Sequence, residues 1–451
     1  MSSNPKSAKT TERLAKKAKH REHSNVKPAK KQALSAQDKP RNVSFKTSEL
    51  EVGTSADARV DDVSTEAGDA GLTSGREKKK TSLPSSFKII AGSYERLLYG
   101  LEGTVSVSSS AASELEWTLK PIFIFPAHVS HIKSVAASPQ GGKWLASGSG
   151  DEIIKVWDLR RRKEVGGLMQ HEGSITHLTF PSRSHLISAS EDGTLCVFRA
   201  RDWAVLRSLK GHKGRVNSVS VHPSGKVALS VGKDRTLYMW DLMRGRRAAS
   251  MKLGYEGELV RWSTTGSLLI VQHQRTINVY STDLEVLYTL EHASRIHDVK
   301  FVQRVDREGE VVFVAAEDKK TTVYEISLDT DTVLRPIAYF VGHKNRVKAI
   351  DTIRIALPST RGDSTTILST VSSDGTINVY DLSLLPSPTP TESSDIPEIS
   401  PVVTYDSKGS RLTCVTLAES GVDHPEKQMP EKGAKRKRDI DEESEEWQGL
   451  S

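Results

Sequence analysis

Histidine, serine and aspartate recur along this chain in an order that could support nucleophilic catalysis. In one copy His128 lies upstream of Ser147, Asp151 follows four residues after the serine, and Trp157 follows six residues later. A serine activated by a histidine that an aspartate orients is the arrangement of many hydrolases. The arrangement returns several times, however, whereas an enzyme needs only one such site. We therefore expect buried hydrogen-bonded chains that tie neighbouring strands together.

The residues of these expected structural networks share the same order from copy to copy. They are His128, Ser147, Asp151, Trp157, His171, Ser188, Asp192, His212, Ser230, Asp234, Trp240, His292, Asp318, His343 and Asp374. Two copies are weaker, because Val314 replaces the hydroxyl residue in one and Gln274 replaces the aspartate in another. The sequence indicates no catalytic, cofactor-binding or metal-binding residue, and we expect no enzyme activity.

The spacing of the copies predicts the fold class. The aromatic residue that ends each copy stands at positions 157, 198, 240, 280, 324 and 380, so the intervals are 41, 42, 40, 44 and 56 residues. Apart from the last, these intervals match the period of about 40–45 residues that is typical of WD repeats. An insertion rich in turn-forming residues around Leu357–Ser364 accounts for the long interval.

The number of blades follows from the two ends of the repeat region. Three predicted strands, Phe87–Ser93, Arg96–Leu101 and Leu119–Phe125, precede the first full repeat and lack a fourth. Arg411–Leu417 is a spare strand after the last repeat. A C-terminal strand that completes the N-terminal blade leaves only short, protected edges. The sequence therefore predicts an all-β, seven-bladed WD40 β-propeller, with six or eight blades left open by the degenerate copy around Tyr280.

Composition places this propeller between two disordered tails. The chain has 451 residues and only 36% hydrophobic residues. We expect a basic and polar tail over 1–86, the propeller over 87–420, and a basic, then acidic tail over 421–451. Residues 1–50 contain 13 Lys/Arg and 4 Asp/Glu, which indicates an anionic partner. Two cysteines, no secretory signal and no membrane-spanning run point to a reduced compartment and no membrane partner.

Three segments also resemble a known family. Residues 147–180, residues 209–242 and the opening stretch FKIIAGSYERLLYGL are similar to the PAK-interacting and maintenance-of-killer family of nucleolar WD-repeat proteins. The resemblance covers roughly 87–420. It implies a ribosome assembly protein that binds assembly factors and ribosomal proteins of the large-subunit (pre-60S) particle. It also implies an alternative, a negative regulator that binds a p21-activated kinase. The long N-terminal tail departs from the family pattern.

One rim of the propeller is a candidate partner-binding surface. The loops that contain the histidines and the turns that contain the aspartates should open on the same rim. The third position after the histidine is arginine in three copies, and lysines accompany two of them. The candidate rim residues are Lys213, Arg215, Arg295, Lys344 and Arg346. Arginine suits bidentate contacts with phosphate or carboxylate, so ribosomal RNA or an acidic assembly factor is the expected partner. Solvated rim charges are the alternative.

Basic clusters also indicate the compartment. Candidate nuclear-targeting residues are Lys16, Lys17, Lys435, Arg436, Lys437 and Arg438. With the family resemblance, they predict a nuclear and nucleolar protein. A further basic run, Arg160–Lys163, should lie on the opposite rim, where exposure to water explains it equally well.

Overall fold

The computed structural model describes residues 83–107, 115–306, 308–326, 334–358, 364–386 and 396–420. Backbone contacts divide the chain into Met1–Glu77 and Lys78–Ser451, and every described residue belongs to the second unit. The described secondary structure is almost entirely strand, with one short 3-10 turn at Leu382–Leu384. Strands of five or six residues with apolar alternation and intervening turns are the expected product of this sequence.

Seven sheets form the propeller, all antiparallel except for one short outer strand of blade 6, and the seven-bladed WD-repeat fold is confirmed. Within a blade, the strands are lettered a to d from the central channel outward. Blade 1 contains β29 (Leu412–Glu419), β1 (Ser86–Ser93), β2 (Leu97–Val107) and β3 (Leu115–Pro126). Blade 2 contains β4 (Ile132–Ala137), β5 (Trp144–Ser149), β6 (Ile154–Asp158) and β7 (Lys163–Leu168). Blade 3 contains β8 (Ile175–Ser182), β9 (His185–Ser190), β10 (Thr194–Arg199) and β11 (Val205–Lys210).

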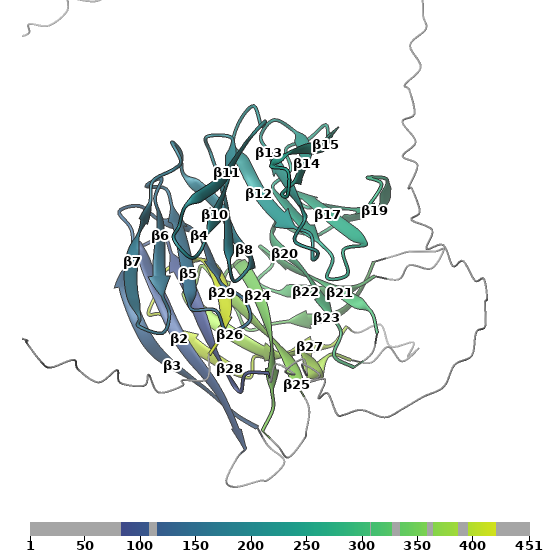
Figure 1. Ribbon diagram of the computed structural model, residues 1–451. Helices are drawn as coiled ribbons and strands as arrows, with labels where there is room; N and C mark the ends of the chain where they lie inside the picture. The colour runs from purple at the N-terminus through teal and green to yellow at the C-terminus, as the bar shows by residue number, and fades with distance from the viewer. Residues whose placement is uncertain are drawn as a thin grey trace, which may run out of the picture. The chain divides into compact units, whose positions relative to one another are not determined.

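The remaining blades continue in chain order around the centre (Figure 1). Blade 4 contains β12 (Val216–Val221), β13 (Val227–Gly232), β14 (Thr236–Asp241) and β15 (Arg246–Lys252). Blade 5 contains β16 (Leu259–Trp262), β17 (Leu268–His273), β18 (Thr276–Ser281) and β19 (Val286–Glu291). Blade 6 contains β20 (Ile296–Gln303), β21 (Glu310–Ala316), β22 (Thr321–Glu325) and β23 (Arg335–Phe340). Blade 7 contains β24 (Val347–Ala356), β25 (Ser364–Ser372), β26 (Thr376–Asp381) and β28 (Val403–Asp406).

Two outer-edge features depart from a simple repeat. The short strand β27 (Glu398–Ile399) pairs in parallel with β23, so blade 6 has a fifth strand that covers its outer edge. The insertion expected around Leu357–Ser364 separates two long strands, β24 and β25, and its residues 359–363 lie outside the described part of the chain.

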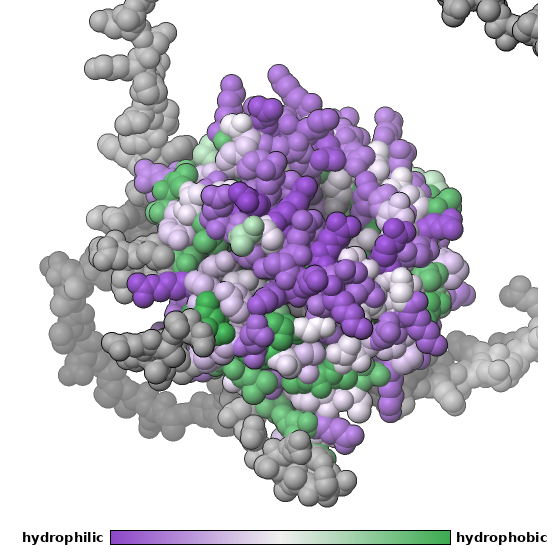
Figure 2. Space-filling model, turned by 180° about the vertical axis from the view of Figure 1, so that it is seen from behind, coloured by the Kyte–Doolittle hydropathy of each residue, from purple (hydrophilic) through white to green (hydrophobic). Residues whose placement is uncertain are grey.

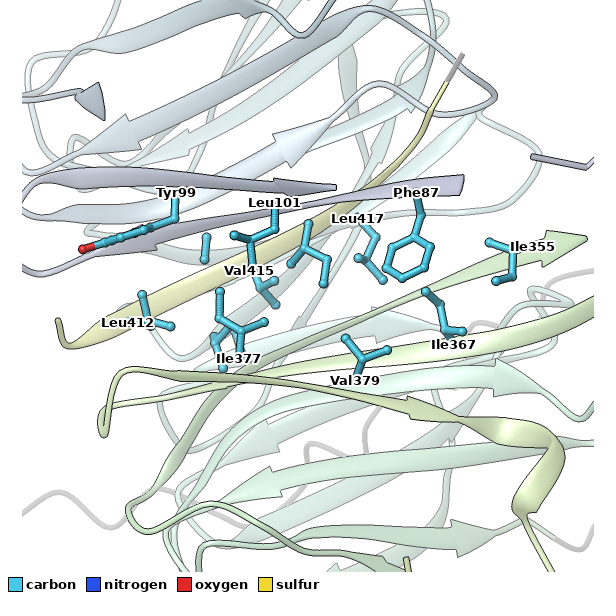
Figure 3. Packing of buried hydrophobic residues seen from close by; sticks show 14 residues of the cluster. Phe87, Tyr99, Leu101, Ile355, Ile367, Ile377, Val379, Leu412, Val415 and Leu417 are labelled. Carbon is cyan, nitrogen blue, oxygen red and sulfur yellow. The ribbon is translucent and has the colours of Figure 1, made fainter. Parts of the chain in front are cut away.

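The C-terminal strand closes the ring from the inside. Strand β29 pairs antiparallel with β1 from Phe87↔Glu419 to Ser93↔Leu412, so it is the innermost strand of blade 1. Its side chains pack with those of β1 and β2 against blade 7 (Figure 3). Phe87 and Leu101 are fully buried there, as are Ile367 and Val379 of blade 7. Each such side chain contributes about 1.5–3 kcal/mol through burial. The closing contact is therefore a hydrophobic interface in addition to a strand pairing.

Candidate functional site

The expected His–Ser–Asp–Trp chain is complete in blade 2. The Trp157 indole donates to the Ser147 hydroxyl at 2.9 Å, and that hydroxyl lies 2.8 Å from His128 Nε2. His128 Nδ1 lies 3.0 Å from Asp151, which also accepts the Val129 backbone N–H. The chain thus connects strand b, strand c and the loop before strand a.

Blade 4 repeats the same chain. Ser230 accepts from the Trp240 indole at 2.8 Å and contacts His212 Nε2 at 2.7 Å, while His212 Nδ1 lies 3.0 Å from Asp234. Ser230 is fully buried. Because all polar atoms of the hydroxyl and imidazole are engaged inside the blade, no open position remains beside the serine for a substrate. These sites stabilise the blade.

Blades 3 and 7 use variants of the network. In blade 3, His171 contacts Ser188 at 2.7 Å and Asp192 at 2.8 Å, and Phe198 replaces the indole. In blade 7, His343 contacts Thr370 at 2.7 Å, whereas its Nδ1 is 3.6 Å from Asp374. Thr376 lies between the two, 2.9 Å from His343 Nδ1 and 2.6 Å from Asp374.

The network is looser in blades 6 and 5. In blade 6, His292 Nε2 lies 3.9 Å from Asp318, which is too far for a hydrogen bond. Val314 offers no hydroxyl, and Nε2 contacts the Thr322 hydroxyl at 3.4 Å instead. In blade 5, Tyr255 stands where blades 2, 3, 4, 6 and 7 have histidine. Its hydroxyl lies 3.0 Å from that of Tyr280 and accepts the Asn278 side-chain N–H at 2.6 Å. The sequence signals for this replacement were the missing histidine and Gln274 in place of the aspartate.

Burial sets the charge state of the networks. It lowers the pKa of His128 and of His212 below the ordinary value, and it outweighs the attraction of Asp151 and Asp234. Burial raises the pKa of Asp151, but His128 and the backbone N–H groups of Ile153 and Val129 hold the net pKa below its usual range. The imidazoles of His128 and His212 are therefore neutral at pH 7 and the Asp151 carboxylate is charged, so in blade 2 each donor of the chain has an acceptor.

The predicted rim residues lie on the face that also contains the histidine loops, here called the upper rim. Lys213 and Arg215 line one surface hollow, and Arg215 and Arg295 line a second hollow of about 300 Å³ that leads toward the channel. Arg346 and Arg295 both act electrostatically on His297, so they share one region.

Carboxylates accompany the arginines of the upper rim. Arg215 pairs with Glu256 at 2.9 Å, Arg295 with Glu258 at 2.9 Å, and Arg346 with Glu317 at 3.8 Å. Each of the three guanidinium groups is about half exposed, so each pair contributes only about 0–1 kcal/mol and a competing anion can displace it. The upper rim is consequently a mixed-charge surface rather than a basic one.

A central channel of about 740 Å³ passes between the innermost strands of all seven blades. Arg261 of β16 extends across it and contacts three other blades. It donates to Asp298 of β20 at 3.1 Å, and lies 3.3 Å from both Ser218 of β12 and His177 of β8. Asp298 also accepts the backbone N–H of Ile350 at 3.1 Å. Sequence reasoning missed this cluster, because nothing in the strand pattern distinguishes an inward arginine from an exposed one.

Polar side chains on the channel wall also connect five of the seven pairs of neighbouring innermost strands. Backbone N–H groups of Leu178, Trp262, Ile350, Leu417 and Ala137 donate to side chains of Ser134, Ser220, Asp298, Asp351 and Thr416, respectively. Burial, reinforced by the guanidinium of Arg261, lowers the pKa of His177 to about 3. Burial, with the nearby cations Lys348, Arg346 and Arg295, lowers the pKa of His297 to about 4.

Several sequence predictions fall outside the described residues. The candidate targeting residues Lys16, Lys17 and Lys435–Arg438 all lie there. Within the described ranges, no cluster of His, Cys, Asp and Glu is arranged to hold a metal ion. The same ranges contain no helix long and apolar enough to cross a bilayer.

Comparison with known proteins matches three segments to the WD domain, G-beta repeat, at residues 119–158, 162–199 and 203–241. The chain is 33% identical over 305 residues to the p21-activated protein kinase-interacting protein 1-like protein of Danio rerio, covering 67% of this chain and 76% of that protein. It is 30% identical over 375 residues to Protein MAK11 of Saccharomyces cerevisiae, covering 75% and 84%. It is 25% identical to the Shk1 kinase-binding protein 15 of Schizosaccharomyces pombe, covering 77% and 89%.

Proposed function

Because the chain belongs to the family of PAK-interacting and MAK11 WD-repeat proteins, we propose that it is a non-catalytic scaffold in the biogenesis of the large ribosomal subunit. In this role it binds assembly factors and ribosomal proteins of the pre-60S particle, and ribosomal RNA is a further candidate partner. The resemblance of residues 87–420 to nucleolar assembly proteins supports this role.

The arrangement of polar groups is the observation that supports a scaffold. The clusters with catalytic residue types are buried and repeated, whereas the upper rim exposes arginines in weak ion pairs. Figure 2 shows hydrophilic residues over the upper and central part of one face of the propeller. A polar surface on a rigid frame suits transient binding of charged partners.

The test reverses the charges of the upper rim. The variant Arg215→Glu, Arg295→Glu, Arg346→Glu should lose co-sedimentation with pre-ribosomal particles on a sucrose gradient. Lys120→Glu, Arg335→Glu, Arg354→Glu changes the charge equally at exposed positions of β3, β23 and β24 away from the upper rim and should leave co-sedimentation intact. Unchanged co-sedimentation of the rim variant contradicts a contact through the upper rim. Absence of the unmodified protein from these particles contradicts the ribosomal role itself.

Nuclear and nucleolar localisation is part of the same proposal. The basic residues Lys16, Lys17 and Lys435–Arg438 are the candidate import signals. Nucleolar accumulation of a fluorescent fusion should disappear when both terminal segments are removed. Nucleolar accumulation of the truncated fusion would show that the propeller contains the targeting signal.

A second candidate function is binding of a protein kinase. The printed names of relatives support it, since several are p21-activated protein kinase-interacting proteins and one is a kinase-binding protein. Affinity purification of the tagged full chain separates the two functions. Ribosomal proteins and assembly factors support the scaffold, whereas a kinase recovered without them supports the regulator.

A further inference from the structure

The face opposite the upper rim has a strong local excess of positive charge in blades 2, 3 and 4. This lower face consists of the a–b and c–d turns with their flanking residues. In these blades they are residues 138–143, 158–163, 181–185, 199–204, 222–226 and 241–247. They contain twelve Lys/Arg and three Asp. The equivalent turns of blade 5, residues 263–267 and 281–285, contain no Lys/Arg and two carboxylates. The positive charge of blades 2, 3 and 4 therefore ends at blade 5.

The turns of blades 2, 3 and 4 form one continuous surface. Arg183 of blade 3 donates from Nε to the Pro139 carbonyl of blade 2 at 3.4 Å. Trp203 of blade 3 packs edge-on against Trp144 of blade 2, with ring centroids 5.2 Å apart. Gly245 lies in the blade 4 turn directly before β15, with φ +67°. A Cβ at this position would lie 2.6 Å from the side chain of Arg207, so blade 3 packs closely against this turn.

The three aspartates of the lower face are engaged by the turns themselves. Asp158 accepts the backbone N–H of Arg160 at 2.9 Å and of Arg161 at 3.1 Å. Asp241 accepts the equivalent groups of Met243 and Arg244, both at 3.0 Å. These bonds hold the turns in shape, and they place the following arginines outward.

Three exposed arginines, one per blade, lie in these turns or directly after them. Asp202, the third aspartate, pairs with Arg199. Within the described part of the chain, no carboxylate forms an ion pair with Arg162, Arg201 or Arg246, and all three side chains are exposed. The upper rim differs, because each of its three arginines has a carboxylate partner.

The distribution of charge favours a phosphate backbone over a protein surface. A stable protein interface generally has an apolar core, yet Met243 is the only strongly exposed large hydrophobic residue among the six described turn segments. Dispersed cations without an apolar anchor are the pattern that neutralises a row of phosphates. We propose that the lower face of blades 2–4 binds the phosphate backbone of RNA. This assignment rests on the proposed ribosomal role and names the partner class and surface within it.

The size of the effect follows from counterion release. For single-stranded nucleic acid, each phosphate contact adds about 0.7 to the slope of log affinity against log salt. Removing three contacts should therefore reduce the slope by about 2 and weaken binding about 50-fold at 0.15 M salt. A sequence-independent backbone contact should lose affinity equally for different RNA sequences.

The experiment measures fluorescence anisotropy of a labelled 20-nucleotide single-stranded RNA with the full chain, across a series of KCl concentrations. The lower-face variant is Arg162→Gln, Arg201→Gln, Arg246→Gln. The matched control, Arg215→Gln, Arg295→Gln, Arg346→Gln, removes the same charge from the upper rim. Both variants retain the basic N-terminal segment, so any difference between them reports the propeller, and a thermal melt checks that each folds like the unmodified protein.

The expected result is a shallower salt slope and about 50-fold weaker binding for the lower-face variant alone. Equal weakening by both variants overturns the proposal, since it indicates net charge rather than a site. An unchanged RNA affinity also overturns it, and loss of binding to a glutamate 20-mer in the same variant would assign the face to an acidic protein. If the unmodified protein does not bind the RNA but still co-sediments with pre-ribosomes, the RNA site is refuted and the scaffold function is retained.

Discussion

Replacing Arg261 by methionine should destabilise the propeller far more than replacing an exposed arginine. The substitution leaves the Asp298 carboxylate, which is 9% exposed, without its guanidinium partner. Removing one member of a buried ion pair costs about 3–5 kcal/mol. The Arg261 side chain is 22% exposed and Asp298 keeps two backbone N–H donors, so we expect a loss at or just below the lower end of that range, about 2–3 kcal/mol.

The assay is equilibrium urea unfolding of the full chain, with the thermal midpoint as a second readout. A loss of 2–3 kcal/mol corresponds to about 3–4 °C for a domain of this size. Arg275→Met is the matched control, because Arg275 and Glu291 form an ion pair with both side chains more than half exposed. That pair should contribute less than about 1 kcal/mol.

A double variant tests the cause of the loss. Arg261→Met with Asp298→Asn should recover part of the stability lost by Arg261→Met alone, since no unpaired buried charge remains. Two results would refute the reasoning. One is an Arg261→Met protein within about 0.5 kcal/mol of the unmodified chain, and the other is a double variant whose loss equals the sum of the two single losses.

Two more predictions concern the buried networks and their protonation. Ser230→Ala removes the acceptor shared by Trp240 and His212, so urea unfolding should show a loss of about 1–3 kcal/mol, whereas the exposed Ser250→Ala should change stability by less than about 0.5 kcal/mol. Similar values for the two variants would contradict a structural network. Stability should also fall with acid between pH 6.5 and 5.5. The pKa of His177 is about 3 in the folded chain, so only the unfolded chain takes up its proton in that window, which costs about 1 kcal/mol of stability between pH 6.5 and 5.5. His177→Gln should reduce this slope, and an identical slope in both proteins would show that His177 is not responsible.

The repeats made most of the fold predictable from sequence. Ser147, Asp151 and Trp157 recur with fixed spacing because each blade needs the same internal bonds, so the period and the seven blades follow. The surface was less predictable. Glu256 and Glu258, which neutralise upper-rim arginines, come from the loop that leads into blade 5, and their proximity depends on how blades are placed around the ring. Spacing within one repeat contains no information about such neighbours.

The same limit applies to the lower face. Arg160–Lys163 was visible as a basic run, but its continuity with Arg201 and Arg246 depends on packing between blades, such as Trp203 against Trp144. Arg261 likewise resembles an ordinary polar position of a strand until the channel is present.

The position of β29 has a consequence for synthesis of the chain. Strand β1 is complete by residue 93, but the strand that pairs with its inner edge ends at Glu419. At about 5–20 residues per second, the ribosome needs roughly 15–65 s to produce the intervening segment. During that interval the apolar inner edge of blade 1 has no partner and is open to pairing with other chains. A nascent chain of this architecture should therefore need protection by a chaperone until its last folded strand emerges.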